Sequence, residues 1–268
     1  MKTAETLRKI EIAGPCAAQD RGQMLLSANE AKRAGVEIVR MPLFKPRTRA
    51  GSFEGLMEAG IPLFIEVANK VGITPATEVL VVKQAEALLN SFLVQSKQDL
   101  VLWLGARNYN SQVQKDMGSL IKGEKRVMLG IKNPMWRDME AWIGAFEYVR
   151  VGGAEDSQLF GIHRGFAPGT DGFRNTPDFA LSMAVKREAN ISMVLDPSHI
   201  GGTKENVCKV IKKSWEAKED GVIFDGMMVE VHPKEFAART DASQQLTWEE
   251  YGLIQKGCIP VFDRWDAA

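Results

Sequence analysis

Positively charged side chains are concentrated in one short stretch, RMPLFKPRTRAGSFEG, which follows the apolar run VEIV. Its first ten residues, from Arg40 to Arg49, hold four cations, two prolines and a phenylalanine. Like charges repel when they are confined, so such a cluster is favourable mainly where anions bind. Arginine offers a planar fork to phosphate or carboxylate, and lysine offers a point charge. The stretch therefore predicts an anion-binding site at the end of a buried strand.

Further cations follow other apolar, β-rich segments. Together they form a cationic group of six residues: Arg40, Lys45, Arg47, Arg107, Lys132 and Arg164. Any one of them could be an ordinary solvated loop charge. Six that converge on one mouth predict more than one anionic group, such as two phosphates and a carboxylate.

A second group contains potential metal ligands: Cys16, His199, Glu230 and Asp241. A thiolate, an imidazole and two carboxylates suit a divalent transition metal that keeps room for water or substrate. Taken alone, Cys16 is better explained as a small buried apolar residue, and His199 could be a hydrogen-bonded loop residue. These residues are far apart in the chain, so the metal prediction depends on a fold that brings them together.

Eight β-rich segments alternate with segments of helical periodicity. They begin at Ile10, Val36, Gly72, Leu100, Val127, Leu159, Ile191 and Gly226. Strands that alternate with helices pair in parallel through right-handed crossovers, and eight such units in about 250 residues match a (β/α)8 barrel. A doubly wound open sheet is the alternative, but it usually has fewer strands, and no G-x-G-x-x-G or P-loop motif is present. We therefore expect an α/β fold, a single-domain TIM barrel over residues 1–268.

Apolar residues at helical spacing mark the helices that should cover the barrel. One predicted face carries Met135, Met139, Trp142, Ile143 and Phe146. Thr176, followed by Pro177, predicts the start of a later helix, and Thr203 predicts another. Trp103 is expected to be a core residue.

In a TIM barrel the functional site lies at the C-terminal ends of the strands. The residues of both groups follow the expected strands, as do Glu78 and Asp196. Strands one and eight are neighbours in a closed barrel, so Cys16 could meet the ligands that follow strand eight. We expect His163 to face away from the site as a packing residue and His232 to support Glu230.

The overall composition excludes some classes of protein. The 268 residues carry 34 basic and 34 acidic side chains, and this zero net charge argues against a general nucleic-acid or membrane-surface binder. No apolar run approaches the roughly 20 residues of a membrane span, and the N-terminus lacks the apolar centre of a signal peptide. Three cysteines, odd in number and far apart, indicate thiols in a reducing compartment, so a cytoplasmic protein is expected.

Six short motifs occur in order at the ends of the expected strands: AGPCA, FKPRT, GARN, HRGF, DPSHIGG and MMVEVHP. Together they resemble 3-deoxy-D-arabino-heptulosonate 7-phosphate (DAHP) synthase, the first enzyme of the shikimate pathway, and most closely its type I-beta branch. The resemblance extends from about Ile10 to Asp241. A related family, 3-deoxy-D-manno-octulosonate 8-phosphate synthase, typically has Ala-Asn-Arg after the strand-two lysine. Here Lys45 is followed by Pro46-Arg47-Thr48, the pattern associated with erythrose 4-phosphate.

The sequence also departs from the family pattern. Met41-Pro42 replaces the usual Gly-Gly, Arg49 replaces a serine, and Asn133-Pro134 replaces Arg-Gly. These changes retain the charged positions and affect the geometry of the aldose phosphate site.

The resemblance implies a metal-dependent, aldol-like condensation of phosphoenolpyruvate with erythrose 4-phosphate and water, which yields DAHP and phosphate. The implied catalytic residues are Lys45, Asp196 and Glu78. The implied substrate contacts are Arg40, Lys45, Pro46, Arg47, Thr48, Arg107, Lys132 and Arg164. The implied metal ligands are Cys16, His199, Glu230 and Asp241, with manganese as the expected ion and iron, cobalt or zinc as alternatives. Lys45, among so many cations, is expected to have a lowered pKa and to act as an acid.

The expected first strand begins near Ile10, which leaves no room for an N-terminal regulatory domain, so we expect no feedback inhibition by aromatic amino acids from this chain alone. The resemblance favours a homo-oligomer. Residues 258–268 could be a truncated linker to a fused or associated chorismate mutase. Two alternatives to DAHP synthase stay open here: another phosphoenolpyruvate-condensing barrel, such as the octulosonate or a sialic acid synthase, and a non-catalytic barrel scaffold.

Overall fold

Eight parallel strands form the centre of the molecule. The computed structural model describes residues 10–47, 50–233 and 238–262. Within these residues the strands are β1 (Ile10–Gly14), β2 (Ile38–Arg40), β3 (Thr74–Val79), β4 (Leu100–Leu104), β5 (Val127–Lys132), β6 (Leu159–His163), β7 (Ser192–Leu195) and β8 (Gly226–Glu230). Each strand pairs in parallel with the next, and β1 pairs with β8, with Gly14 opposite Glu230. The predicted TIM barrel is confirmed, and it places the end of β1 beside the end of β8.

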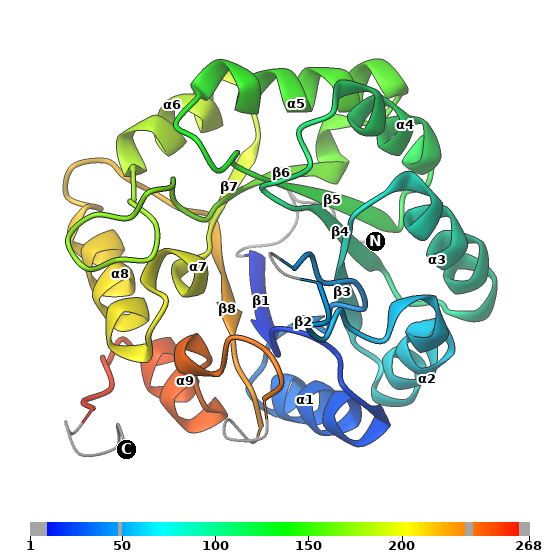
Figure 1. Ribbon diagram of the computed structural model, residues 1–268, viewed down its shortest axis with the longest axis horizontal. Helices are drawn as coiled ribbons and strands as arrows, with labels where there is room; N and C mark the ends of the chain where they lie inside the picture. The colour runs from blue at the N-terminus through cyan, green and yellow to red at the C-terminus, as the bar shows by residue number, and fades with distance from the viewer. Residues whose placement is uncertain (1–9, 48–49, 234–237, 263–268) are drawn as a thin grey trace.

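Helices surround the barrel (Figure 1). The described residues form α1 (Arg21–Arg33), α2 (Ile61–Val71), α3 (Val82–Gln95), α4 (Ser111–Ile121), α5 (Met139–Gly152), α6 (Phe179–Glu188), α7 (Pro197–Gly201), α8 (Lys204–Glu216) and α9 (Trp248–Gln255). Short 3-10 turns lie at Met57–Gly60, Asp156–Gln158 and Ala242–Gln244. The short helix α7 lies inside the ring of longer helices, next to β7 (Figure 1). None of the described helices is long and apolar enough to cross a membrane.

The core has two parts, because successive residues of a strand face opposite sides. Ile10 and Ile12 of β1 belong to a cluster inside the barrel, whereas Ala13 belongs to the larger cluster between strands and helices. Trp103 of β4 is fully buried in the inner cluster, so its assignment to the core is confirmed.

Two predicted helix positions are wrong. Met135 precedes α5 and lines a cavity instead of continuing the helix face. Helix α6 begins at Phe179, where Asp178 is the N-cap and accepts a hydrogen bond from the backbone N–H of Leu181. Thr176 instead pairs with Phe166 through two backbone hydrogen bonds, a contact that no local pattern reveals. Thr203 does cap α8, as predicted.

Candidate active site

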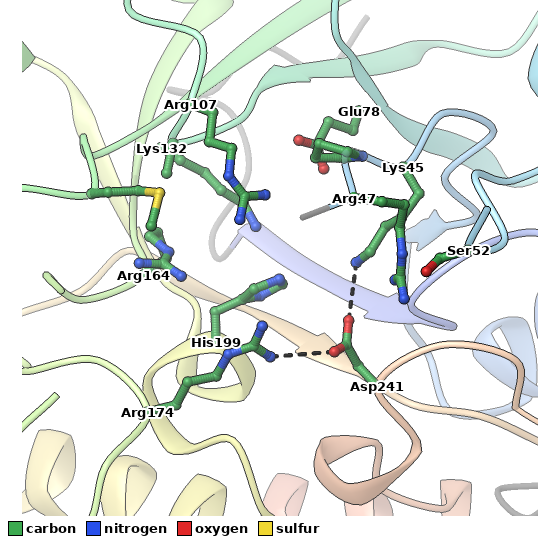
Figure 2. Close-up of a pocket in the computed structure, with 13 residues that line it drawn as sticks. Lys45, Arg47, Ser52, Glu78, Arg107, Lys132, Arg164, Arg174, His199 and Asp241 are labelled. Carbon is green, nitrogen blue, oxygen red and sulfur yellow. Dashed lines mark hydrogen bonds and ion pairs between the residues drawn. The ribbon is translucent and has the colours of Figure 1, made fainter. Parts of the chain in front are cut away.

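A cavity of about 320 Å³ opens at the C-terminal ends of the strands (Figure 2). Five of the six predicted cations line it: Lys45, Arg47, Arg107, Lys132 and Arg164. The predicted residues Pro46, Glu78, His199 and Asp241 line it as well. Thr48, predicted as a sugar-phosphate contact, lies outside the described residues, as does Arg49. The barrel therefore gathers five of the six predicted cations and two of the four predicted metal ligands around one cavity, whereas Cys16 and Glu230 are not among its lining residues.

Asp196 is a buried residue that contacts two of the side chains lining this cavity. It is fully buried at the end of β7 and caps α7, accepting a hydrogen bond from the backbone N–H of His199 at 3.1 Å. Its other oxygen lies 2.9 Å from Lys132 Nζ and 2.8 Å from His199 Nδ1. Burial alone would raise the pKa of Asp196, but His199 and Lys132 outweigh it and hold the pKa well below its usual value. Asp196 is thus an ionised anchor for two residues that reach the cavity.

His199 lies on α7 and not at the end of a strand, because Asp196 and Pro197 start a helical turn there. Burial lowers the pKa of His199 to about 4, so its imidazole is neutral at pH 7. Its Nδ1 faces Asp196, and its Nε2 lies 3.8 Å from Glu230 Oε1. A carboxylate on one ring nitrogen is the arrangement that orients histidine ligands of metals.

Arg40 is the predicted cation that does not line the cavity. It is 1% exposed, and its guanidinium group donates a 2.9 Å hydrogen bond to Glu230 Oε1 and a 3.1 Å hydrogen bond to the carbonyl of Pro15. Gln244 donates to the other oxygen of Glu230 at 2.7 Å. The indole ring of Trp103 lies 5.4 Å from the Arg40 guanidinium. Burial opposes ionisation of Glu230, but the cations around it, Arg40 first, lower its pKa.

Cys16, Lys45 and Asp241 meet although up to 225 residues separate them. Cys16 Sγ donates to Asp241 Oδ2 at 3.2 Å, and Lys45 Nζ lies 2.7 Å from the sulfur and 3.4 Å from the same carboxylate oxygen. Burial raises the pKa of the Cys16 thiol to about 12. Asp241 has a left-handed backbone, with φ of 44° and ψ of 41°, a conformation that costs free energy and is common at functional sites.

The predicted lowering of the Lys45 pKa is wrong. Burial does act to lower it, but Cys16, Glu230, Asp241 and Glu78 together outweigh burial and raise the pKa above its usual value. The prediction considered only the cations that follow the strands. The fold also brings acidic side chains from distant parts of the chain around the Lys45 ammonium group.

The candidate metal ligands form two contacting pairs, Cys16 with Asp241 and His199 with Glu230. Among the described residues, no three histidine, cysteine or carboxylate side chains lie close enough together to form a ready-made metal site. The chemistry of the donors nevertheless fits a divalent transition metal, since they offer one neutral imidazole nitrogen, one sulfur and two ionised carboxylates. Cys16 follows β1, Glu230 ends β8, Asp241 lies in the loop after β8, and His199 lies on α7 after β7. These strand ends are neighbours in the barrel, so the residues present are suitable for such an ion.

Glu78, near the end of β3, reaches the cavity because a glycine, Gly105, directly follows the next strand, β4. A Cβ atom on Gly105 would lie 2.1 Å from Glu78 Oε1, so the carboxylate occupies space that only glycine leaves open. Figure 2 shows Glu78 near Lys45 on the side of the cavity away from Arg164.

Sequence reasoning missed Ser52, Met135 and Arg174, which also line the cavity. Arg174 lies in the loop between β6 and α6, and its guanidinium group is 3.3 Å from Asp241 Oδ1 (Figure 2). Reading only the strand ends could not find it. The unusual length of this loop was the available indication, because long loops in compact domains are often functional.

His163 is a packing residue, as expected, whereas the expected support of Glu230 by His232 stays a prediction. His163 is fully buried among aromatic rings, including those of Trp142 and Phe224. His232 is buried, and its Nε2 lies 3.3 Å from Gln23 Nε2.

The chain is similar to proteins of known activity. A family model described as the DAHP synthetase I family matches residues 3–260. Phospho-2-dehydro-3-deoxyheptonate aldolase of Thermotoga maritima is 30% identical over 247 residues, which are 91% of this chain and 68% of that protein. The crystal structure of the Thermotoga maritima DAHP synthase has a TM-score of 0.77 at 26% identity and covers 92% of this chain and 67% of its own. A truncated form of the Thermotoga maritima enzyme has a TM-score of 0.75 at 27% identity, over 92% of this chain and 85% of its own. With its closed barrel and cationic mouth, this chain is an enzyme that belongs to the DAHP synthetase I family.

Proposed function

We propose that the chain catalyses the metal-dependent condensation of phosphoenolpyruvate with erythrose 4-phosphate and water, which gives DAHP and phosphate. The cavity carries this proposal, because its walls supply more cations than a single anionic group needs. Two separate regions of positive charge would each bind one phosphorylated substrate.

The first region suits the phosphate of phosphoenolpyruvate. It consists of Arg107, Lys132 and Arg164, which approach from neighbouring strand ends β4, β5 and β6 (Figure 2). Guanidinium forks and an ammonium group can together contact several phosphate oxygens. Arg40 was also expected near the carboxylate of this substrate; because it is buried against Glu230 and does not line the cavity, we propose that it acts through its positive charge and not by direct contact.

The second region suits the phosphate of the sugar. Arg47 and Ser52 line the cavity in the β2 loop, and Pro46 stiffens the chain between Lys45 and Arg47 (Figure 2). This placement would hold the aldehyde end of the sugar toward Lys45, with its phosphate away from the first region.

Cys16, His199, Glu230 and Asp241 would hold the divalent ion. When bound there, such an ion supplies a Lewis acid that polarises the aldehyde oxygen of the sugar. The chain's own part is to present a neutral imidazole, which the lowered pKa of His199 provides, and to keep Glu230 ionised beside Arg40.

Bond formation joins the third carbon of phosphoenolpyruvate to the aldehyde carbon, and positive charge develops at the second carbon. Lys45 is proposed to give a proton to the new hydroxyl oxygen, since its raised pKa keeps the ammonium form populated at neutral pH. Glu78 is proposed to accept a proton from the water that attacks the second carbon, after which the tetrahedral intermediate releases phosphate. Asp196 is proposed to act by orienting Lys132 and His199, since it is fully buried beneath them.

The test is an assay of the purified chain with Mn²⁺ and phosphoenolpyruvate, with either erythrose 4-phosphate or arabinose 5-phosphate as the second substrate. Phosphate release together with a seven-carbon product, identified by mass spectrometry and abolished by chelator, is the expected result. Reaction with arabinose 5-phosphate alone, no reaction at all, or full activity in chelator would each overturn the proposal.

A further inference from the structure

The side chain of Asn175 connects two parts of the active site that have separate tasks. It lies in the loop between β6 and α6 and is 4% exposed. Its Oδ1 accepts a 2.8 Å hydrogen bond from Arg164 Nη1, and its Nδ2 donates a 2.6 Å hydrogen bond to the backbone carbonyl of His199. A guanidinium group can only donate and a carbonyl can only accept, so these partners fix which way the amide points.

The backbone around Asn175 is held as firmly as its side chain. Its N–H donates to the carbonyl of Ile200 at 3.1 Å, and the N–H of Arg174 donates to Gly201 at 3.3 Å. The segment thus lies along α7, and Thr176 joins it to Phe166 on the other side. This loop therefore connects the end of β6 to the turn that carries His199.

Two glycines make space for this segment. A Cβ atom on Gly165 would lie 2.8 Å from the Cβ of Asn175, and one on Gly202 would lie 2.7 Å from the Cβ of Arg174. Both glycines have a positive φ, of 79° and 78°, which other residues rarely adopt. The local chain is therefore built to bring the amide against Arg164 and His199.

Arg164 is held from its backbone as well. Asn133 Oδ1 accepts a 2.7 Å hydrogen bond from the N–H of Arg164, and Asn133 Nδ2 donates to the carbonyl of Gly165 at 2.8 Å. Its guanidinium group has Asn175 and the carbonyl of Gly165 as hydrogen-bond partners and leaves its remaining donors for the cavity. Figure 2 shows Arg164 and His199 reaching the cavity from the same side.

We propose that Asn175 is a positioning residue that holds the guanidinium group of Arg164 and the His199 turn in one arrangement, so that the phosphate site and the metal site form together. This inference rests on the proposed function, because it takes Arg164 as a phosphoenolpyruvate ligand and His199 as a metal ligand. The Oδ1 atom of Asn175 contacts Arg164 and its Nδ2 atom contacts the backbone carbonyl of His199, so a substitution can break one contact and keep the other.

The test uses Asn175→Ala, which removes both contacts, and Asn175→Asp, which keeps an acceptor for Arg164 but places a carboxylate oxygen against the His199 carbonyl. Thr176→Ala is the matched control, since among the residues that the structure describes its hydroxyl group bonds within the loop, to Pro168 and Thr170. Dissociation constants for phosphoenolpyruvate and for Mn²⁺ are measured separately by titration calorimetry, and folding is checked by circular dichroism.

We expect Asn175→Ala to weaken binding of phosphoenolpyruvate about tenfold, the effect of one hydrogen bond to a charged group. Binding of Mn²⁺ should weaken about 10- to 100-fold, as when the residues behind metal ligands are changed. In Asn175→Asp only Mn²⁺ binding should weaken, with phosphoenolpyruvate affinity within about threefold of wild type. If Asn175→Ala does not fold, the nearly isosteric Asn175→Asp carries the test.

Wild-type affinities in both variants, with only thermal stability changed, would overturn the inference. Equal weakening of phosphoenolpyruvate binding in both variants would also overturn it, because the amide oxygen would then not hold Arg164. A wild-type chain that binds both ligands but makes no DAHP would refute the proposed function and leave the positioning role standing.

Discussion

The ammonium nitrogen of Lys45 lies 2.7 Å from the sulfur of Cys16. The proposed acid and one proposed metal ligand are therefore in direct contact, and Asp241 contacts both. Substitutions at either position should consequently change both metal binding and proton transfer, and only a measurement that separates the two can assign the roles.

Replacing Cys16 with alanine should abolish metal-dependent turnover while the barrel still folds. The thiol is fully buried, so its loss leaves only a small cavity, but it removes the one soft ligand of the proposed set. We expect kcat to fall at least about 100-fold, the upper range for disturbed metal sites, and Mn²⁺ binding by calorimetry to weaken in parallel. Cys208→Ala, a buried cysteine of α8, is the control and should keep full activity. Normal Mn²⁺ affinity in Cys16→Ala would refute its role as a ligand.

Replacing Gly105 with alanine should reduce catalysis through Glu78. The added methyl group would lie 2.1 Å from Glu78 Oε1 and must displace the flexible end of that side chain. We expect kcat to fall about 10²- to 10⁴-fold, the usual contribution of a general base, with KM for phosphoenolpyruvate nearly unchanged. Glu78→Gln should have the same effect. A Gly105→Ala enzyme as active as wild type, alongside an inactive Glu78→Gln, would show that the carboxylate tolerates displacement.

Much of the architecture could be predicted because it depends on local patterns. Eight β-rich segments separated by helical spacing sufficed for the barrel, and parallel strands bring their ends to one face. What failed depends on contacts between distant residues. The pKa of Lys45 is raised by Cys16 and Asp241, whose positions relative to the lysine no periodicity reveals. Thr176 is drawn into pairing with Phe166, which moves the start of α6 to Phe179.

His163 should make the fold less stable at acidic pH. Burial lowers its pKa to about 3, against roughly 6.5 in an unfolded chain, so the folded protein holds it neutral. The contribution of neutral His163 to the free energy of unfolding is complete above pH 6.5. It declines as the pH falls toward 3, because the unfolded state then binds the proton more readily than the folded state. The expected loss between pH 7.5 and pH 5 is about 2 kcal/mol from this group.

Urea unfolding at the two pH values measures this effect in the wild type and in His163→Gln, which retains an acceptor for the backbone N–H of Asp178. Other titrating groups act alike in both proteins, so the difference between their losses of stability from pH 7.5 to pH 5 is due to His163. An equal loss of stability in both proteins would refute the assignment.

Replacing Gly118 with alanine should destabilise the barrel without changing its chemistry. Helices α4 and α5 cross so closely that a Cβ atom on Gly118 would lie 1.9 Å from the carbonyl oxygen of Val149. Both contacting groups belong to helix backbones, which cannot move apart without loss of packing, and overpacking of this kind lowers the free energy of unfolding by about 1–3 kcal/mol. Gly144→Ala on α5 is the matched control, because a Cβ atom there meets nothing within 4 Å, and it should stabilise the protein by up to about 1 kcal/mol. Chemical denaturation compares the three proteins, and Gly118→Ala should keep the wild-type KM for phosphoenolpyruvate because α4 and α5 lie on the outside of the barrel (Figure 1). A Gly118→Ala protein as stable as Gly144→Ala would mean that the helices can separate freely.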